Sequence, residues 1–163
     1  MSTERTTGRT LLVALLLLAA AFVAYFPVLG SGFLAWDDPE TVVGNPAVAG
    51  APAAGLLTIW TEPVFLTYLP VWFTSLWIDN LFFGEWAPGY HAVNLLLHFL
   101  NALVLLFVVR RLSKSDFIAG AAAVLFVLHP AATESVAWIS ERKGLLAFLF
   151  SSLAILSFLR AVG

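Results

Sequence analysis

The stretch HAVNLLLHFLNALVLLFVVRR, residues 91–111, decides how this chain folds. Its first part, 91–109, holds no Asp, Glu, Lys or Arg. It has about the length of the roughly 20 apolar residues that cross the hydrocarbon core of a bilayer as a helix. Arg110 and Arg111 follow, and together with Lys114 they form a basic cluster of the kind that marks a cytoplasmic end. We therefore expect a transmembrane helix over 91–109 that runs toward the cytoplasm.

The composition of the whole chain agrees with a membrane protein. Of the 163 residues, 61% are hydrophobic and 11% are charged, whereas soluble domains are roughly half apolar and a quarter charged. Cysteine is absent, so neither a disulfide framework nor a thiol nucleophile enters the argument. The formal net charge of -2 and the lack of a basic tract exclude a nucleic-acid partner.

Three further apolar runs predict an all-α membrane protein of about four transmembrane helices, with spans over about 11–29, 91–109, 112–128 and 144–161. A cleaved signal peptide is the alternative for the first run, but this run exceeds the usual h-region of about 7–15 residues. The third run is strictly apolar only over 117–128, which rises about 18 Å as a helix. We expect that span to start near Leu112 with Lys114 snorkelling, and to end inside the bilayer under a cover of protein or water.

Two loops remain between these spans, a first loop over 30–89 and a second loop over 129–143. The first loop contains five of the six tryptophans and six carboxylates but no Lys or Arg. The positive-inside rule places such a segment on the outer side and the N-terminus in the cytoplasm. Within it, 71–83 is expected to be an interfacial helix with Ser75 and Asp79 on one face. The alternative, a span over 71–83, would put the basic cluster outside.

Adjacent carboxylates at Asp37 and Asp38 follow the first span. Two like charges in a partly dry site raise the pKa of one of them, which suits a general base that takes a proton from an attacking hydroxyl. The pair could also hold a magnesium or manganese ion, although the chemistry requires no cofactor. The alternative interpretation is a solvated turn before Pro39.

Adjacent cations at Arg142 and Lys143 stand out because six of the eight Lys and Arg lie on the cytoplasmic side of this topology and these two do not. A lipid phosphate at the outer leaflet would compensate them, with Arg offering a bidentate contact. The alternative is a salt bridge to Glu141 or Glu134. His129 and Glu134 are possible pocket residues that could equally hold the second loop in place.

Four polar side chains recur at i, i+3, i+7 and i+10 on one face of the helix over 91–109: His91, Asn94, His98 and Asn101. A polar stripe in lipid must face protein or water, and hydrogen bonding between helices is the favoured interpretation. A metal shared by His91 and His98 is disfavoured, since the two are two turns apart with no carboxylate nearby. His91 remains a possible pocket residue.

Four stretches resemble, in this order, the N-terminal region of the transmembrane and tetratricopeptide-repeat O-mannosyltransferases and their bacterial relatives, in the glycosyltransferase C superfamily. Nearly the whole chain takes part in this resemblance. The stretches are FLAWDDPETVVGNPAV (33–48), YLPVWFTSLWIDNLFFG (68–84), GYHAVNLLLHFLNALVL (89–105) and LFVLHPAATESVAWISERKGLLAFLF (125–150). That family continues with more spans and usually with tetratricopeptide repeats, so we expect 1–163 to be the N-terminal membrane domain of a longer chain.

The resemblance implies a membrane enzyme that transfers a sugar, mannose-like, from a polyprenyl- or dolichyl-phosphate carrier to a hydroxyl of a protein or glycan acceptor. Asp37 and Asp38 match the acidic pair of the family, and one of them is the expected base. Arg142 is the candidate for the carrier phosphate, assisted by Lys143. The expected location is a bacterial inner membrane, or the endoplasmic reticulum membrane in a eukaryote. The alternative is a non-catalytic protein that binds a lipid phosphate or acts as a transporter-like module.

Overall fold

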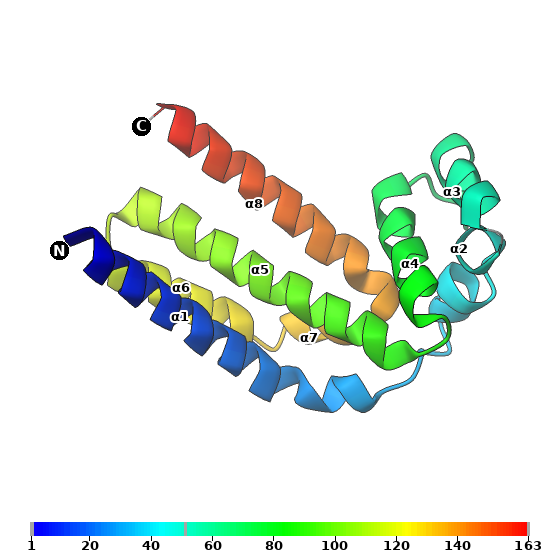
Figure 1. Cartoon of the computed structure of the whole chain (residues 1–163), viewed down its shortest axis with the longest axis horizontal. Helices are drawn as coiled ribbons and strands as arrows, with labels where there is room; N and C mark the ends of the chain where they lie inside the picture. The colour runs from blue at the N-terminus through cyan, green and yellow to red at the C-terminus, as the bar shows by residue number, and fades with distance from the viewer. Residues whose placement is uncertain (1, 51, 163) are drawn as a thin grey trace.

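The computed structural model describes residues 2–50 and 52–162, with the backbone alone for 2–7 and 9. The described residues form helices and turns with no β-strand, which confirms the all-α prediction (Figure 1). The elements are α1 (Ser2–Tyr25), η1 (Phe26–Gly30), η2 (Pro39–Val43), α2 (Pro46–Ala49), α3 (Pro52–Thr61), α4 (Pro70–Phe83), α5 (Ala87–Ser113), α6 (Asp116–Leu128), α7 (Ala132–Ala137), η3 (Ile139–Glu141) and α8 (Arg142–Val162).

Helix α5 is the centre of the bundle, and α1, α6 and α8 pack along it (Figure 1). Small residues at the contacts allow the helix backbones to approach closely, as in other membrane bundles. Ala21 of α1, Ala102 of α5 and Ala123 of α6 are all fully buried in one cluster with Leu17 and Leu106. Because every long helix contacts α5, the side chains of α5 decide what the interior of the bundle can hold.

Three helical segments are long and apolar enough to cross a membrane, and they are Thr10–Gly30, Ala87–Ser113 and Ile139–Val162. This length and composition identify an integral membrane protein. Helix α6 has only 13 residues, or about 20 Å. Its end at Leu128 is covered by α7, which packs against both α6 and α8. Protein therefore covers the end of the short helix, as one of the sequence alternatives expected.

The predicted start of the third span near Leu112 is wrong. Leu112 is still part of α5, which continues to Ser113 and ends at Lys114 in the left-handed region at a φ of 55°. Ser115 then caps α6, because its hydroxyl accepts a hydrogen bond from the Ile118 amide at 3.4 Å. A left-handed residue followed by a serine cap stops one helix and starts the next within two residues.

The first loop folds into four short helical elements, η2, α2, α3 and α4, at the end of the bundle away from both termini (Figure 1). They share a core of their own that includes Val42, Ile59, Phe73 and Leu76 and reaches Ile139 of the second loop. The predicted helix over 71–83 is confirmed as α4. Its interfacial position stays a prediction.

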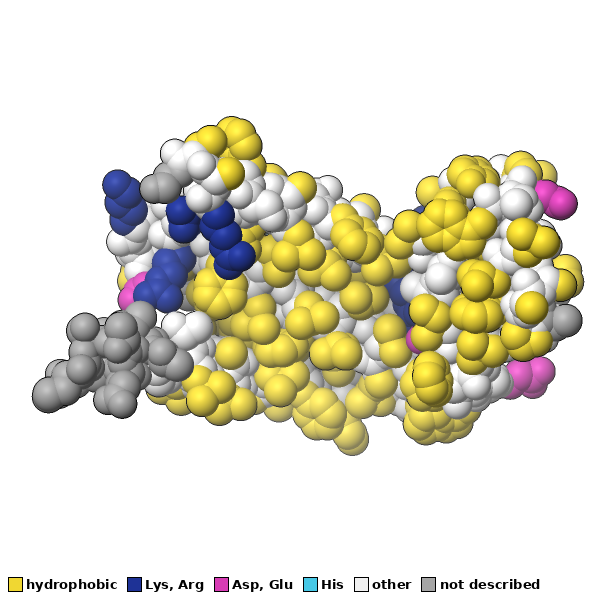
Figure 2. Space-filling view, turned by 45° about the horizontal axis from the view of Figure 1, so that its top comes forward, with side chains coloured by type: hydrophobic (Ala, Val, Ile, Leu, Met, Phe, Trp, Pro, Cys, Tyr) yellow, Lys and Arg dark blue, Asp and Glu magenta, His cyan; other side chains and the backbone are white. Residues whose placement is uncertain are grey.

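Charge is divided along the long axis of the molecule, as Figure 2 shows. Lys and Arg gather at the end that carries the termini, and Asp and Glu mark the far end formed by the first loop. Apolar side chains cover the bundle between the two ends (Figure 2). This is the asymmetry on which the orientation prediction depends, and the orientation itself stays a prediction.

Candidate functional site

Asp38 connects the two loops. Its side chain is fully buried, and Oδ2 accepts a hydrogen bond from the Leu34 amide at 2.8 Å. Oδ1 accepts from Ser140 twice, from the backbone amide at 3.0 Å and from the hydroxyl at 2.5 Å. The Thr41 hydroxyl lies 2.6 Å from the same Ser140 hydroxyl. Asp38 is therefore an anchor that fastens the start of the first loop to the second loop.

The side chain of Asp37 differs from that of Asp38 in its burial and in its partners. Its carboxylate is half-buried and forms no hydrogen bond or ion pair within residues 2–50 and 52–162. Its backbone carbonyl accepts hydrogen bonds from the amide and hydroxyl of Thr41, at 2.8 and 2.6 Å. Thr41 thus fixes the main chain of Asp37, and the Asp37 carboxylate has no hydrogen-bond partner. Of the predicted acidic pair, Asp37 is the member whose side chain is partly exposed.

A groove of about 570 Å³ opens between the first loop and α7, and Trp36, the residue before Asp37, lines it. Trp36, which is 74% exposed, and Trp138 form its aromatic part, with ring centroids 5.7 Å apart. Glu134, exposed on α7, also lines it. Glu134 therefore lines a groove, and its role in a substrate pocket stays a prediction.

Arg142 lies deep inside the protein. Its side chain is fully buried, and Nη2 lies 2.5 Å from Oδ2 of Asp79. Nε donates to Asn94 Oδ1 at 2.7 Å, Nη2 to the Tyr90 carbonyl at 3.1 Å and Nη1 to the Ser75 carbonyl at 3.3 Å. The contact of Arg142 with a lipid phosphate stays a prediction. Burial and these partners favour the alternative, an internal salt bridge, with Asp79 as the partner in place of Glu141 or Glu134.

The Arg142 contacts join α4 and α5 to the first turn of α8. Ser75 and Asp79 share the face of α4 that the sequence predicted, and that face meets Arg142. Burial raises the pKa of the Asp79 carboxyl, and the Arg142 guanidinium opposes this rise. Both charges are buried away from water. Removing either one would therefore leave the other buried without an opposite charge.

Lys143 is the exposed member of the basic pair. Its Nζ lies 2.6 Å from Glu141 Oε1, and 37% of the side chain is exposed. The ammonium also lies over two tryptophan rings, 5.1 Å from the centroid of Trp72 and 5.8 Å from that of Trp138. Since Trp138 also contacts Trp36, the Lys143 cation and the Trp36 groove share one aromatic side chain. Lys143 is the cation that an anionic ligand can reach.

The polar stripe of α5 forms hydrogen bonds with neighbouring segments, as the favoured interpretation expected. His91, 1% exposed, donates from Nε2 to the Gly32 carbonyl at 3.4 Å. The Asn94 amide donates to the Trp138 carbonyl at 3.2 Å, and His98 and Asn101 contact α6 and α8. His91 therefore binds the backbone at the start of the first loop and does not line the Trp36 groove.

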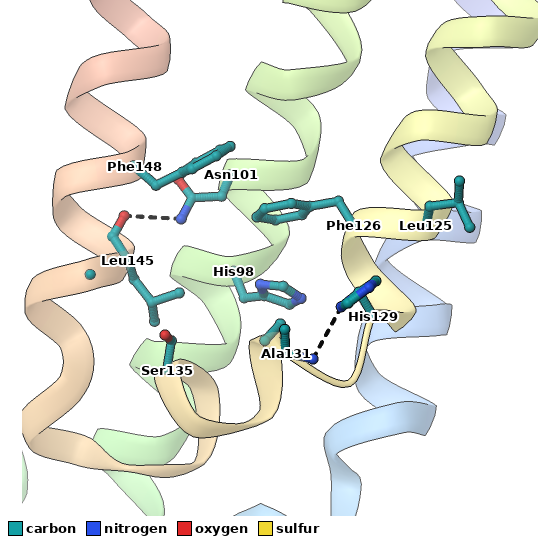
Figure 3. Close-up of a pocket in the computed structure, with 11 residues that line it drawn as sticks. His98, Asn101, Leu125, Phe126, His129, Ala131, Ser135, Leu145 and Phe148 are labelled. Carbon is teal, nitrogen blue, oxygen red and sulfur yellow. Dashed lines mark hydrogen bonds between the residues drawn. The ribbon is translucent and has the colours of Figure 1, made fainter.

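His129 is exposed and lies elsewhere. It lines a separate pocket between α5, α6, α7 and α8, and its Nδ1 accepts a hydrogen bond from the Ala131 amide at 3.1 Å. The structure thus joins Asp38 to the second loop through Ser140 and places Glu134 and Lys143 beside Trp138, and it leaves His129 out of that group, in the separate pocket of Figure 3.

Both oxygens of Asp38 accept hydrogen bonds from Leu34 and Ser140, and a magnesium or manganese ion at the acidic pair stays a prediction. No group of three or more His, Cys, Asp or Glu that could hold a metal occurs among the described residues. That the reaction requires no cofactor stays a prediction.

The sequence did not reveal the partners of two residues, Ser140 and Asp79. Ser140 binds Asp38 across 102 residues of sequence, and a serine directly before three charged residues carries no signal of such a partner. Asp79 was placed only on a face of α4, and its spacing from Ser75 was the available sign that the face meets something polar.

Comparisons with known proteins agree with the sequence resemblance. The chain is 35% identical over 150 residues to the protein O-mannosyl-transferase Tmtc1 of Drosophila melanogaster, which covers 87% of this chain and 17% of that protein. It is 32% identical over 155 residues to a protein O-mannosyl-transferase of Caenorhabditis elegans, covering 87% of this chain and 22% of that protein. The human protein O-mannosyl-transferase TMTC1 is 35% identical over 160 residues, covering 91% of this chain and 18% of its own length.

The resemblance to the transmembrane O-mannosyltransferases is therefore confirmed. The chain spans about a fifth of the length of these curated relatives. No protein-family model and no solved structure matches it.

Proposed function

We propose that this chain supplies the sugar-transfer surface of a membrane glycosyltransferase, which moves a mannose-like sugar from a polyprenyl- or dolichyl-phosphate carrier to a Ser or Thr hydroxyl of a protein. The names of the relatives support the sugar and the protein acceptor. One observation about the site carries the proposal. Asp37 offers an unpaired, partly exposed carboxylate one residue after Trp36 of the aromatic groove, while the neighbouring Asp38 fastens this loop to Ser140.

The proposed reaction is a single displacement at the anomeric carbon. Asp37 accepts the proton of the acceptor hydroxyl, and the hydroxyl oxygen forms a bond to the anomeric carbon. The bond between that carbon and the carrier phosphate breaks, and its electron pair leaves with the phosphate. One displacement from the opposite face inverts the configuration of the sugar.

Lys143 is the proposed partner of the departing phosphate. A half-exposed ammonium can approach a lipid headgroup, and it stabilises the negative charge that grows on the phosphate oxygens. The phosphate replaces Glu141, which lies 2.6 Å from Nζ in the free protein. Arg142 is then a positioning residue, since its contacts fix the start of α8 on which Lys143 stands.

The proposal is tested in the full-length protein by Asp37→Asn, with transfer of radiolabelled mannose from the lipid carrier to an acceptor peptide as the readout. Loss of a general base lowers the rate by about 10²- to 10⁴-fold. The matched control is Glu40→Gln, an exposed carboxylate three residues away, which should retain transfer. Membrane insertion and thermal unfolding should match the parent protein in both variants.

Transfer retained by Asp37→Asn would refute this assignment of the base. If proteoliposomes of the parent protein show solute flux and no sugar transfer, the transporter-like alternative replaces the enzyme.

A further inference from the structure

The connection between α3 and α4 contains a tight turn over residues 64–67. Val64 and Thr67 pair through two backbone hydrogen bonds, of 2.8 and 3.0 Å. Phe65 and Leu66 between them both have a positive φ, 46° and 60°. Turns with a positive φ at both central residues are usually built from Asn and Gly, because a bulky side chain is strained in the left-handed region. The chain therefore places two large apolar residues at positions that disfavour them.

Leu66 projects from the tip of this turn, where it is 98% exposed. Tyr68, Leu69 and Val71 follow it in the chain and are exposed as well. The whole segment 63–78 contains no Asp, Glu, Lys, Arg or His. An uncharged apolar surface on a strained backbone indicates a contact with lipid or with another protein.

The turn lies at the end of α4 that is next to α8. Helix α4 crosses the end of the bundle between α5 and α8 (Figure 1). The residues 68–70 before and at its start line a groove with Leu146 and Phe150 of α8. Phe150 lies about 12 Å along α8 from Arg142. The far end of α4 instead contacts the first turn of α5, where the Phe83 ring meets Tyr90. The start of α4 thus reaches beside the length of a bundle helix, whereas its far end stays at a helix terminus.

The neighbouring part of α8 identifies lipid as the contact. It belongs to the segment Ile139–Val162, which is long and apolar enough to cross a membrane, and its Phe150 is 55% exposed. The apolar surface of the turn therefore continues a surface that faces the hydrocarbon of a bilayer. Lys143 lines the same groove and is a cation that suits lipid phosphates. Tyr68, whose hydroxyl donates to the Trp60 carbonyl at 3.0 Å, is of the residue type that gathers at the headgroup level.

We propose that the 64–67 turn inserts into the bilayer leaflet beside α8, with Leu66 in the hydrocarbon and Tyr68 at the headgroup level. Transfer of the Leu66 side chain from water into lipid offsets the strain of its backbone. The inserted turn fastens the start of α4, and with it the first loop, to the membrane surface. The insertion does not depend on the proposed sugar transfer, so either proposal can fail without the other.

The first test measures the depth of Leu66 in phosphatidylcholine nanodiscs. The 163-residue chain has no cysteine, so Leu66→Cys takes a single nitroxide spin label. Electron paramagnetic resonance compares its collisions with oxygen, which concentrates in hydrocarbon, and with a water-soluble nickel complex. We expect more collisions with oxygen than with nickel. Phe150→Cys is the reference inside the span. Phe82→Cys is the matched control, because Phe82 is apolar, 78% exposed and at the far end of α4, and there nickel should dominate.

The second test uses the unmodified full-length protein, so that no label disturbs the turn. The nanodiscs then contain a phosphatidylcholine with a photoreactive diazirine in the middle of one acyl chain. Mass spectrometry identifies the peptides that the activated lipid captures. We expect capture on the 63–69 segment and on α8, and none on the 82–86 segment at the far end of α4.

Three outcomes would overturn the proposal. A Leu66 label that collides mainly with nickel, as at Phe82, would mean that the turn lies in water. A label that neither reagent reaches would mean that protein covers the tip, such as a second copy of the chain. Capture of α8 without the 63–69 segment in the full-length protein would mean that the turn does not enter the hydrocarbon there.

Discussion

The chain has two pairs of adjacent like charges, Asp37–Asp38 in the first loop and Arg142–Lys143 at the start of α8. Both pairs consist of one buried and one partly exposed residue. One member of each pair is fully buried, Asp38 in one and Arg142 in the other. The other member remains partly exposed. In each pair the buried residue fastens the chain and thereby positions its neighbour.

The two anchors differ in what surrounds them. Asp38 is held by neutral donors, two backbone amides and a hydroxyl. Arg142 faces a full opposite charge at Asp79 as well as neutral acceptors. Removal of a neutral partner leaves an unpaired dipole, whereas removal of Asp79 leaves a buried charge, which is more costly. The comparison therefore predicts a graded series of effects on stability.

The largest effect on stability is expected for Asp79→Ala. The change leaves the Arg142 guanidinium buried without an opposite charge, which costs about 3–5 kcal/mol in free energy of unfolding. Titration with sodium dodecyl sulfate in micelles, followed by tryptophan fluorescence, measures this. Glu85→Ala removes an exposed carboxylate from the same loop and should change the value by less than about 0.5 kcal/mol. Similar losses in both variants would contradict the importance of the buried pair.

A smaller effect is expected for Asp38→Ala. Leu34 and Ser140 lose their acceptor, and buried donors without partners cost about 1–3 kcal/mol. Asp37→Ala is the matched variant next to it, and its free energy of unfolding should stay within about 0.5 kcal/mol of the parent. The same titration compares them. If Asp37→Ala destabilises as much as Asp38→Ala, the division between anchor and free carboxylate is wrong.

The smallest effect on stability is expected for Lys143→Met. A partly exposed ion pair with Glu141 contributes about 0.2–1 kcal/mol. Sugar transfer by the full-length protein should fall further, by about 10- to 100-fold, because a charge-assisted hydrogen bond to the phosphate is lost. Lys143→Arg keeps the charge and should retain most of the transfer. Parallel losses of stability and transfer in Lys143→Met would point to a purely structural role.

Much of the fold was predictable because it follows from local patterns. The central helix was expected over 91–109 and runs over Ala87–Ser113, and the polar stripe on it faces the neighbouring segments. The start of α6 was not predictable from hydropathy, because Leu112 is apolar and the break depends on the left-handed Lys114. The sequence also did not predict the hydrophobic core of the first loop, because contacts between its short helices form that core.

The candidate site was predictable as a set of residue types and not as an arrangement. Sequence reasoning named Asp37, Asp38, Arg142 and Lys143, and their placement separates each pair into a buried and an accessible residue. The two members of each pair carry the same charge and have the same sequence neighbourhood, so local sequence does not show which of them is buried. The separation depends on Ser140 and Asp79, which lie far away along the chain.

By itself the sequence determined an all-helical membrane protein, its central span and the stripe of polar residues that the bundle has to satisfy. Length, hydropathy and helical periodicity are enough for this, because each acts over about 20 neighbouring residues. Only the tertiary structure decided that Asp38 binds Ser140 across 102 residues and that Arg142 pairs with Asp79. Burial of a charge is decided by which distant groups can satisfy it, and folding brings those groups together.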